Sequence, residues 1–279
     1  MNLVLDIDGT ICFDGQQIDQ DIVDRLLSLH NIGCTIIFAS ARPIRDLLPV
    51  LPKQFHLFPL IGGNGSIVSI NGHIRPLATI QPKSFKVIKD VINHYDLDYI
   101  VDDQWDYAAR VDESHTIFRR LDPQRLAHKL TLDDIKAPIK TILLNIANED
   151  FDEIAAYIAT TAPNLSLINH SNEHNIDITA KYINKFTAIE SILGSQPTYI
   201  AFGNDHNDIE MLQHAEIGYF VNNNQIDVAI FKNKNKIQCI DANTDALCLV
   251  LDRLLEDLVK KISEYMHSNY IENDYQFRL

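Results

Sequence analysis

The segment from residue 3 to residue 10 constrains the fold most, because an apolar run passes there directly into two aspartates and a glycine. The apolar run is typical of a buried strand, and side chains at i and i+2 of a strand point the same way. Asp6 and Asp8 are therefore expected to face one site. Two close carboxylates repel unless they share a proton or a cation such as Mg²⁺. Gly9 permits a sharp turn, and Thr10 offers a hydroxyl and an N–H to an anion.

Length and charge narrow the class of protein. The 279 residues suit two modest domains, and a net charge of −14 disfavours binding to nucleic acid or to an anionic membrane surface. The four cysteines form no metal-type pair, the first residues lack a basic leader, and no apolar run approaches the roughly 20 residues of a membrane span. We expect a cytoplasmic protein with a small-molecule partner, and the sequence indicates no oligomeric state.

The first part of the chain alternates between strand and helix patterns. Apolar spacing predicts a helix over residues 19–30 and a strand over 35–39, followed by a strand at 57–61 and a hairpin across Asn71-Gly72. A strand, a helix and a second strand form a right-handed crossover with parallel strands. Asp8 and Ser40 should then emerge at the same edge of one sheet.

The pattern changes after residue 80. The order becomes α-β-β-α-β-α-β-β, which suits an open-faced α+β layer. The predicted elements are a helix from Pro82 through Ile92, strands at 98–101 and 107–111, a helix at 123–130, a strand at 140–146, a helix at 152–160, and strands at 165–169 and 175–179.

The original alternation then resumes. It comprises a helix at 185–193, a strand at 198–202, a polar loop at 203–208, a helix through Met211, a strand at 217–221 and a long helix at 244–266. We therefore predict a parallel-sheet α/β core made of residues 1–80 and 183–279, with an α+β domain inserted as residues 81–182.

Four segments resemble, in order, the four motifs of the haloacid dehalogenase superfamily of phosphotransferases. Asp6 to Thr10 resembles the first motif, Ser40 the second, Lys185 the third, and the segment 203–208 the fourth. The passage 177–185 is similar to the strand-to-lysine passage of the Cof-type branch, called subfamily IIB. This resemblance implies a Rossmann-like core with an α+β cap inserted between the second and third motifs.

The resemblance also implies a chemical role for each matching residue. Asp6 is the expected nucleophile, forming an aspartyl-phosphate, and Asp8 the general acid and base. The predicted phosphate-binding residues are Thr10, Ser40, Lys185 and Asn207. The predicted Mg²⁺ ligands are Asp6, Asp8 through its backbone carbonyl, Asn204 and Asp208.

Two positions depart from the family pattern. The fourth motif usually carries an aspartate as direct metal ligand where this chain has Asn204, whose amide oxygen can coordinate Mg²⁺ without adding charge. Ala41 stands where a glycine usually follows the hydroxyl residue of the second motif. The first change predicts weaker metal binding unless Asp205 or Asp208 compensates.

The predicted activity is Mg²⁺-dependent hydrolysis of a small phosphorylated metabolite, with a sugar phosphate favoured and pyridoxal phosphate or flavin mononucleotide next. A phosphomutase or phosphotransferase, and a catalytically weak binding protein for a phosphometabolite, are the alternatives. Asn64 and Arg110 are candidate substrate contacts, although Asn64 also suits a turn with positive φ. Packing and surface roles are the more common interpretation at four further candidate positions on the cap, which are Trp105, Tyr107, Arg119 and Arg120.

Overall fold

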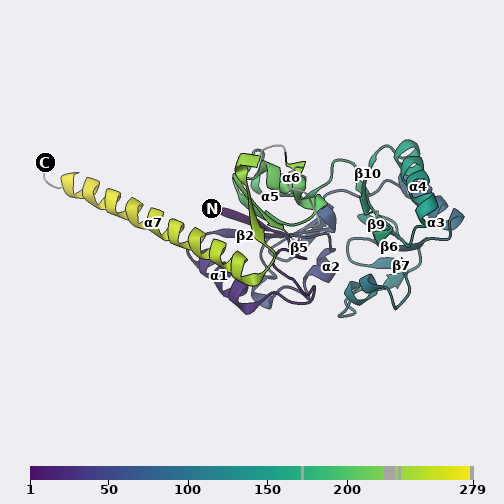
Figure 1. Cartoon of the computed structure of the whole chain (residues 1–279), viewed down its shortest axis with the longest axis horizontal. Helices are drawn as coiled ribbons and strands as arrows, with labels where there is room; N and C mark the ends of the chain where they lie inside the picture. The colour runs from purple at the N-terminus through teal and green to yellow at the C-terminus, as the bar shows by residue number, and fades with distance from the viewer. Residues whose placement is uncertain (171–172, 223–229, 232–233, 277–279) are drawn as a thin grey trace.

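The structure is a computed structural model that describes residues 1–170, 173–222, 230–231 and 234–276. Two β-sheets lie side by side along the long axis of the molecule, and the C-terminal helix projects from the end opposite the second sheet (Figure 1). The first sheet belongs to the core and the second to the inserted segment.

The core sheet has mainly parallel strands. Its members are β1 (Asn2–Leu5), β2 (Thr35–Ala39), β3 (Leu60–Gly62), β4 (Ile67–Ile70), β5 (His73–Pro76), β12 (Ile200–Gly203), β13 (Ile217–Asn222) and β14 (Ile237–Asp241). Their spatial order is β14-β13-β12-β1-β2-β3-β4-β5, with only β4 and β5 antiparallel to their neighbours. Because β1 lies between β2 and β12, the carboxyl ends of strands from both halves of the core meet at one edge of the sheet.

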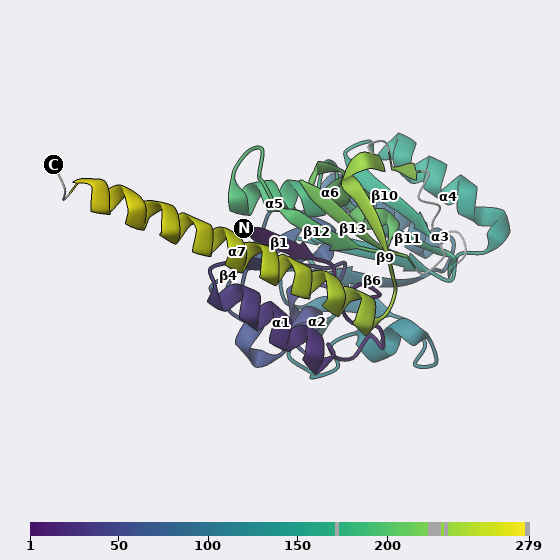
Figure 2. The same ribbon diagram turned by 60° about the vertical axis from the view of Figure 1, so that its left-hand side comes forward.

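Helices cover both faces of this sheet, as the strand pattern requires. Leu3 and Leu5 of β1 point into the layer beneath α1 (Gln20–Asn31) and α7 (Thr244–Gln276). Val4 points to the opposite layer, beneath α5 (Lys185–Leu193) and α6 (Ile209–His214). Figure 2 shows α1 and α7 packed together on one side and α5 and α6 on the other. The short α2 (Ile44–Leu47) follows β2.

The inserted segment forms a second sheet with helices on one face. Its elements are α3 (Pro82–His94), β6 (Asp98–Asp102), β7 (Tyr107–Arg110), β8 (Lys129–Leu130), β9 (Lys140–Leu144), α4 (Asn148–Thr161), β10 (Leu165–His170) and β11 (Asn175–Ala180). The strand order is β10-β11-β9-β6-β7-β8, antiparallel except for β7 with β8. Apolar residues of α3 and α4 pack on one face of the sheet. The other face carries Ile100, Asp102, Lys140 and Asp177 toward the core.

Short 3₁₀ helices occupy several of the loops. They are η1 (Lys53–Phe55), η2 (Gly63–Gly65), η3 (Thr116–Arg120), η5 (His206–Asp208) and η7 (Lys234–Lys236). Three of them carry residues of the candidate site: η2 after β3, η3 in the inserted segment and η5 after β12.

The helix predicted over residues 123–130 is wrong. Asp122 and Arg125 have positive φ, and the Asp122 carboxylate accepts hydrogen bonds from the backbone N–H groups of Leu126 and Ala127. The Asp122 side chain therefore holds this backbone in a turn and not in a helix. The short strand β8 is the regular element that follows it within residues 123–130. The sequence analysis also missed α2 and β14.

The long C-terminal helix begins at the predicted residue and continues further than expected, to Gln276. Its first turns bury Leu247, Leu251 and Leu254 against the core. No helix in the described ranges combines the length and the apolar character needed to cross a membrane.

Candidate active site

The candidate site begins where β1 ends. The Asp6 N–H donates to the carbonyl of Phe202, and the chain then turns, with the N–H groups of Thr10 and Ile11 donating to the Ile7 carbonyl. Gly9 has φ +79°, and a Cβ there would lie 2.3 Å from the Asn204 amide. Glycine is therefore required both for the turn and for the close approach of the loop after β12.

Asp6 is buried between two hydrogen-bond donors. Lys185, at the start of α5, donates from Nζ to Asp6 Oδ1 at 2.5 Å, and the Thr10 hydroxyl donates to Oδ2 at 2.8 Å. Burial, and then the nearby carboxylate of Asp208, raise the pKa of Asp6 to about 7 against the opposing effect of Lys185 and Thr10. Although burial opposes it, Asp208 and Asp6 raise the pKa of Lys185, which stays protonated. A cation thus holds the expected nucleophile in place.

The carboxylate of Asp208, which was predicted as a metal ligand, accepts hydrogen bonds from protein donors at both oxygens, and its role toward a metal stays a prediction. Its Oδ1 accepts from Lys185 at 2.6 Å, and its Oδ2 accepts from the N–H groups of Asn204 and Asp205 at 2.9 and 3.1 Å. The side chain is completely buried. Both oxygens are engaged by protein donors, so this carboxylate positions Lys185 and the loop after β12.

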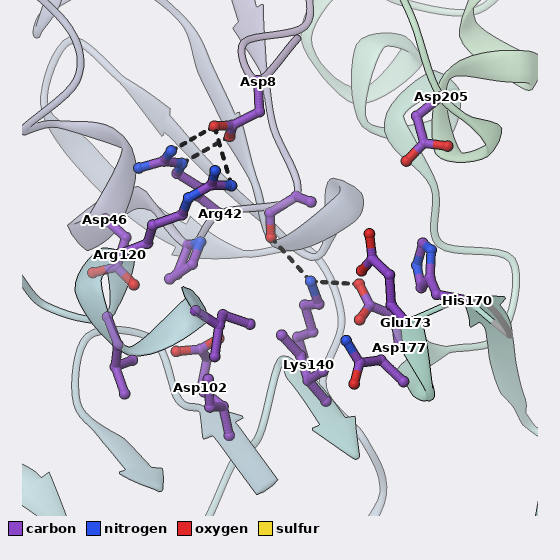
Figure 3. Close-up of a pocket in the computed structure, with 17 residues that line it drawn as sticks. Asp8, Arg42, Asp46, Asp102, Arg120, Lys140, His170, Glu173, Asp177 and Asp205 are labelled. Carbon is purple, nitrogen blue, oxygen red and sulfur yellow. Dashed lines mark hydrogen bonds and ion pairs between the residues drawn. The ribbon is translucent and has the colours of Figure 1, made fainter. Parts of the chain in front are cut away.

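The Asp8 carboxylate has cationic partners different from those of Asp6. The strand ends at Leu5, so its alternation does not extend to residue 8. Arg42 donates two hydrogen bonds to the Asp8 carboxylate, from Nε at 2.8 Å and from Nη2 at 2.5 Å (Figure 3). A guanidinium nitrogen of Arg120, on η3, lies 3.7 Å from the same carboxylate. Each aspartate of the pair therefore has its own cationic partner.

A cluster of oxygens marks the place where a cation fits. The end of the Asn204 side-chain amide lies 3.0 Å from the Thr10 hydroxyl, 3.1 Å from Asp6 Oδ2 and 3.0 Å from the Asp8 carbonyl oxygen. A carboxylate, a backbone carbonyl and an amide oxygen are ligands that suit Mg²⁺. The donor set holds a single carboxylate, and the described residues include no cluster of three Asp, Glu, His or Cys side chains suited to a metal.

Ser40 and the two other predicted asparagines lie nearby. Ser40 is buried at the end of β2, where its Oγ accepts from the Arg42 N–H. Asn64 has φ +57°, as its turn position suggested, and links the two parts of the chain: its Nδ2 donates to Asp177 and its Oδ1 accepts from Asn207. Asn207 and Asn64 thus tie the loop after β12 to the inserted segment.

A cavity of about 260 Å³ lies between the core loops and the open face of the second sheet. Asp8, Arg42 and Asp205 line it from the core, and apolar side chains such as Ile100 and Ile142 line the opposite wall (Figure 3). Lys140 pairs there with Asp177 at 2.6 Å and donates to the carbonyl of Ala41, in the loop after β2. The cavity joins polar groups of the core to a partly apolar wall of the cap.

Of the two predicted substrate contacts, Arg110 is not brought to this cavity. It sits at the far end of β7, where it pairs with Asp96 at 2.9 Å and bonds the Leu97 carbonyl. Arg110 is not among the residues that line the cavity, and its role as a substrate contact stays a prediction without support from this geometry. Arg120 lines the cavity instead, whereas Trp105 and Tyr107 lie against Arg45 and the loop at Leu126.

Sequence reasoning missed Arg42, Lys140 and a buried cluster beside them. Arg45 is fully buried and pairs with Asp46 and Asp102, at 2.7 and 2.9 Å. A signal was present, because Asp102, Lys140 and Asp177 are charged residues in or at the ends of strands rich in apolar residues. Charges in such strands are rarely buried unless they are paired.

Comparisons with known proteins agree with this geometry. A family model described as haloacid dehalogenase-like hydrolase matches residues 3–251. A candidate phosphatase of Haemophilus influenzae is 24% identical over 256 residues, covering 88% of this chain and 95% of that protein. The 5-amino-6-(5-phospho-D-ribitylamino)uracil phosphatase YitU of Bacillus subtilis is 21% identical over 234 residues, covering 79% and 86%.

Solved structures show the same fold. SMU.1108c from Streptococcus mutans superposes with a TM-score of 0.75 at 21% identity, and the HAD subclass IIB sugar phosphatase BT4131 with 0.67 at 18%. Each comparison covers 91% of this chain and 98% of the other. The motifs, the inserted cap and the family match agree, and the chain belongs to the haloacid dehalogenase-like hydrolases, with the Cof-type, subfamily IIB arrangement.

Proposed function

We propose that this hydrolase is a Mg²⁺-dependent phosphatase for a small phosphorylated metabolite. The observation that carries the proposal is the Asp6 carboxylate, buried between Lys185 and the Thr10 hydroxyl beside a cavity that begins at Asp8. An activated carboxylate, a fixed cation and a second carboxyl on the leaving-group side are what phosphoryl transfer through an acyl-phosphate needs.

The residues divide the reaction into two displacements. An oxygen of Asp6 attacks phosphorus, the bond to the leaving alkoxide breaks, and Asp8 gives that alkoxide a proton. Asp8 then takes a proton from water, which attacks phosphorus and releases Asp6 and inorganic phosphate. Lys185, Thr10 and Ser40 supply charge and hydrogen-bond donors to the phosphoryl oxygens. Arg42 fixes the Asp8 carboxyl.

Asp6 Oδ2, the Asp8 carbonyl and the Asn204 amide oxygen would hold Mg²⁺ in this proposal. The metal, when bound, offsets negative charge on the phosphoryl oxygens. Asp208 acts through its hydrogen bonds to Lys185 and to the backbone of the loop after β12, and is a positioning residue.

A sugar phosphate remains the leading substrate, with pyridoxal phosphate or flavin mononucleotide next. The relatives support small phosphomonoesters, because one is named a sugar phosphatase and another acts on a phosphoribitylamino-uracil. A cavity of about 260 Å³ accommodates a molecule of that size. Its mixture of charged side chains and isoleucines suits a leaving group with both hydroxyls and an apolar face.

The test is phosphate release from a panel of phosphometabolites with and without Mg²⁺, using Asp6→Asn as the blank. We expect activity that disappears in Asp6→Asn and in chelator. Equal release by wild type and Asp6→Asn would overturn the proposal. Transfer of the phosphoryl group to a second hydroxyl without phosphate release would identify the phosphotransferase alternative.

The alternative of a weak enzyme or binding protein is supported by one observation, Asn204 in place of a charged metal ligand. It predicts that a phosphometabolite binds in calorimetry without turnover. A gain of phosphate release in Asn204→Asp would then show that the amide limits catalysis.

A further inference from the structure

The Asn204 amide occupies a position that only one of its two ends suits. The amide atom turned toward β1 has three oxygens within 3.1 Å: the Thr10 hydroxyl, Asp6 Oδ2 and the Asp8 carbonyl. The last two have no hydrogen to donate when Asp6 is ionised. The side chain is 8% exposed, so bulk water does not moderate the contact.

If the amide oxygen faces this cluster, the hydrogens are too few. The Thr10 hydroxyl has one hydrogen and already lies 2.8 Å from Asp6 Oδ2. An amide oxygen would then meet carbonyl and carboxylate oxygens at hydrogen-bond distance with no proton between them, which only a cation would offset. If Nδ2 faces the cluster, all three oxygens accept hydrogen bonds or lie within reach of one.

We propose that Asn204 takes both orientations in turn. Without metal, its N–H₂ donates to Asp6 Oδ2 and the Asp8 carbonyl and takes the place of the cation. When Mg²⁺ binds, the amide makes a half-turn and presents Oδ1 as a ligand. The metal must therefore displace internal hydrogen bonds, which weakens its binding but keeps the metal-free site assembled. This inference rests on the Mg²⁺ dependence of the proposed function.

Gly9 supports the same conclusion, because the loop after β1 closes tightly over the other side of the amide. A Cβ at residue 9 would lie 2.3 Å from Nδ2 and 3.2 Å from Cγ in the orientation that turns the oxygen inward. Because residue 9 is glycine and has no Cβ, the space beside the amide that a half-turn needs stays free.

A carboxylate at position 204 should stabilise the metal-bound protein and destabilise the metal-free protein. Asn204→Asp adds a charge and removes the N–H donors, so the metal-free site would hold three mutually repelling groups around Thr10. We expect Asn204→Asp to bind Mg²⁺ at least about tenfold more tightly and, in chelator, to melt at a lower temperature than wild type.

The experiment uses the full chain, stripped with chelator at pH 8. Calorimetry measures Mg²⁺ affinity, thermal denaturation measures stability, and ¹⁵N NMR follows the Asn204 side-chain amide, identified by its absence in Asn204→Asp. The matched control is Asn207→Asp, which adds the same charge three residues along without contacting Asp6 or the Asp8 carbonyl. We expect the Asn204 amide signals to shift as Mg²⁺ saturates the site.

Equal gains in affinity from Asn204→Asp and Asn207→Asp would overturn the inference, because added charge alone would explain them. Amide signals that stay unmoved at saturating Mg²⁺ would also overturn it. Phosphate release in that case would leave the proposed function standing. Metal binding that moves the amide without phosphate release would support the inference and count against the phosphatase.

Discussion

Asp6 combines two requirements that conflict. A nucleophile must be ionised, yet burial next to Asp208 raises its pKa from 3.8 to about 7. Lys185 bridges the two carboxylates and limits the cost of ionising them together. The buried charges of this site lower the stability of the folded protein and keep the Asp6 carboxylate reactive. A cation placed at Asp6 Oδ2 would offset the remaining negative charge.

The raised pKa of Asp6 predicts a pH-dependent stability difference between wild type and Asp6→Asn. The folded protein holds the Asp6 proton more tightly than the unfolded chain does, so ionised Asp6 costs stability at high pH and not below about pH 4. Urea unfolding in chelator measures the free energy of unfolding of both proteins. Between about pH 4 and pH 7, this free energy should rise for Asp6→Asn relative to wild type by up to about 4 kcal/mol. A difference that is constant with pH would contradict the assignment.

Arg120, on the inserted segment, comes close to Asp8, the proposed acid and base. It lies 3.7 Å from Asp8 and lines the cavity, whereas Arg119 beside it is exposed outside the lining. We expect Arg120→Ala to lower kcat/KM about tenfold, by removing a positive charge from the leaving-group side. Arg119→Ala is the control, and equal losses in the two variants would assign the effect to the net charge of the cap.

At the scale of the elements, the cap is fastened to the core by buried polar contacts. Lys140 of β9 reaches the carbonyl after β2, and Asp177 of β11 reaches Asn64. The two also pair with each other, and their side chains are 3% and 10% exposed. These contacts place the open face of the cap sheet over the loops that carry the site.

Removing one partner of this pair should be severe. Lys140→Met leaves Asp177 buried without its cation, and we expect a loss of about 3–5 kcal/mol in the free energy of unfolding. The double variant Lys140→Met, Asp177→Asn should recover part of that loss. The control is the exposed pair of Lys89 and Asp133, where Lys89→Met should cost less than about 1 kcal/mol. Similar losses in the two single variants would show that the buried pair is not special.

The alternation of strands and helices was predictable because burial on each face repeats with the period of the element. In β1, for example, Leu3 and Leu5 face one core layer and Val4 faces the other. The inserted α+β layer was predicted because the order of helices and strands changes after residue 80. The helix over 123–130 failed because the Asp122 side chain replaces the helical hydrogen bonds, which spacing does not reveal. The limits of the inserted domain, 81–182, stay a prediction.

The sequence predicted that some candidate-site residues lie close together, but it did not predict most of their hydrogen-bond partners. Asp6, Thr10 and Lys185 lie together as the motifs indicated. The partners of Asp8 and Asp208 depend on Arg42 and on two backbone N–H groups, which are brought close only by the folded chain. The position of Arg110 depended on the direction of β7, which no local pattern specifies.

At the scale of the whole molecule, α7 belongs to the core only at its beginning. Leu247, Leu251 and Leu254 are buried, whereas Val259, Ile262 and Tyr265 are 50%, 39% and 71% exposed. The helix continues past the core into solvent (Figure 1). Residues 259–265 of this helix therefore add little apolar burial within one chain.

Truncation after Lys261 should accordingly leave the free energy of unfolding within about 1 kcal/mol of wild type. Leu251→Ala, which empties a fully buried position of the same helix, should cost about 2–5 kcal/mol. Urea unfolding of the two variants decides the matter. A large loss on truncation would show that the projecting turns stabilise the fold.

The central place of β1 also sets an order of events during synthesis. Leu3 pairs on one side with Ile36 and on the other with Ile200. After β2 has been made, the other edge of β1, the strand just before Asp6, has no partner until the ribosome has added about 160 more residues, which takes roughly 10 to 30 s at usual rates of translation. The nascent chain must protect an apolar strand edge for that time. The surroundings of Asp6, the proposed nucleophile, are therefore among the last parts of the fold to be completed, although Asp6 is encoded near the start of this sequence.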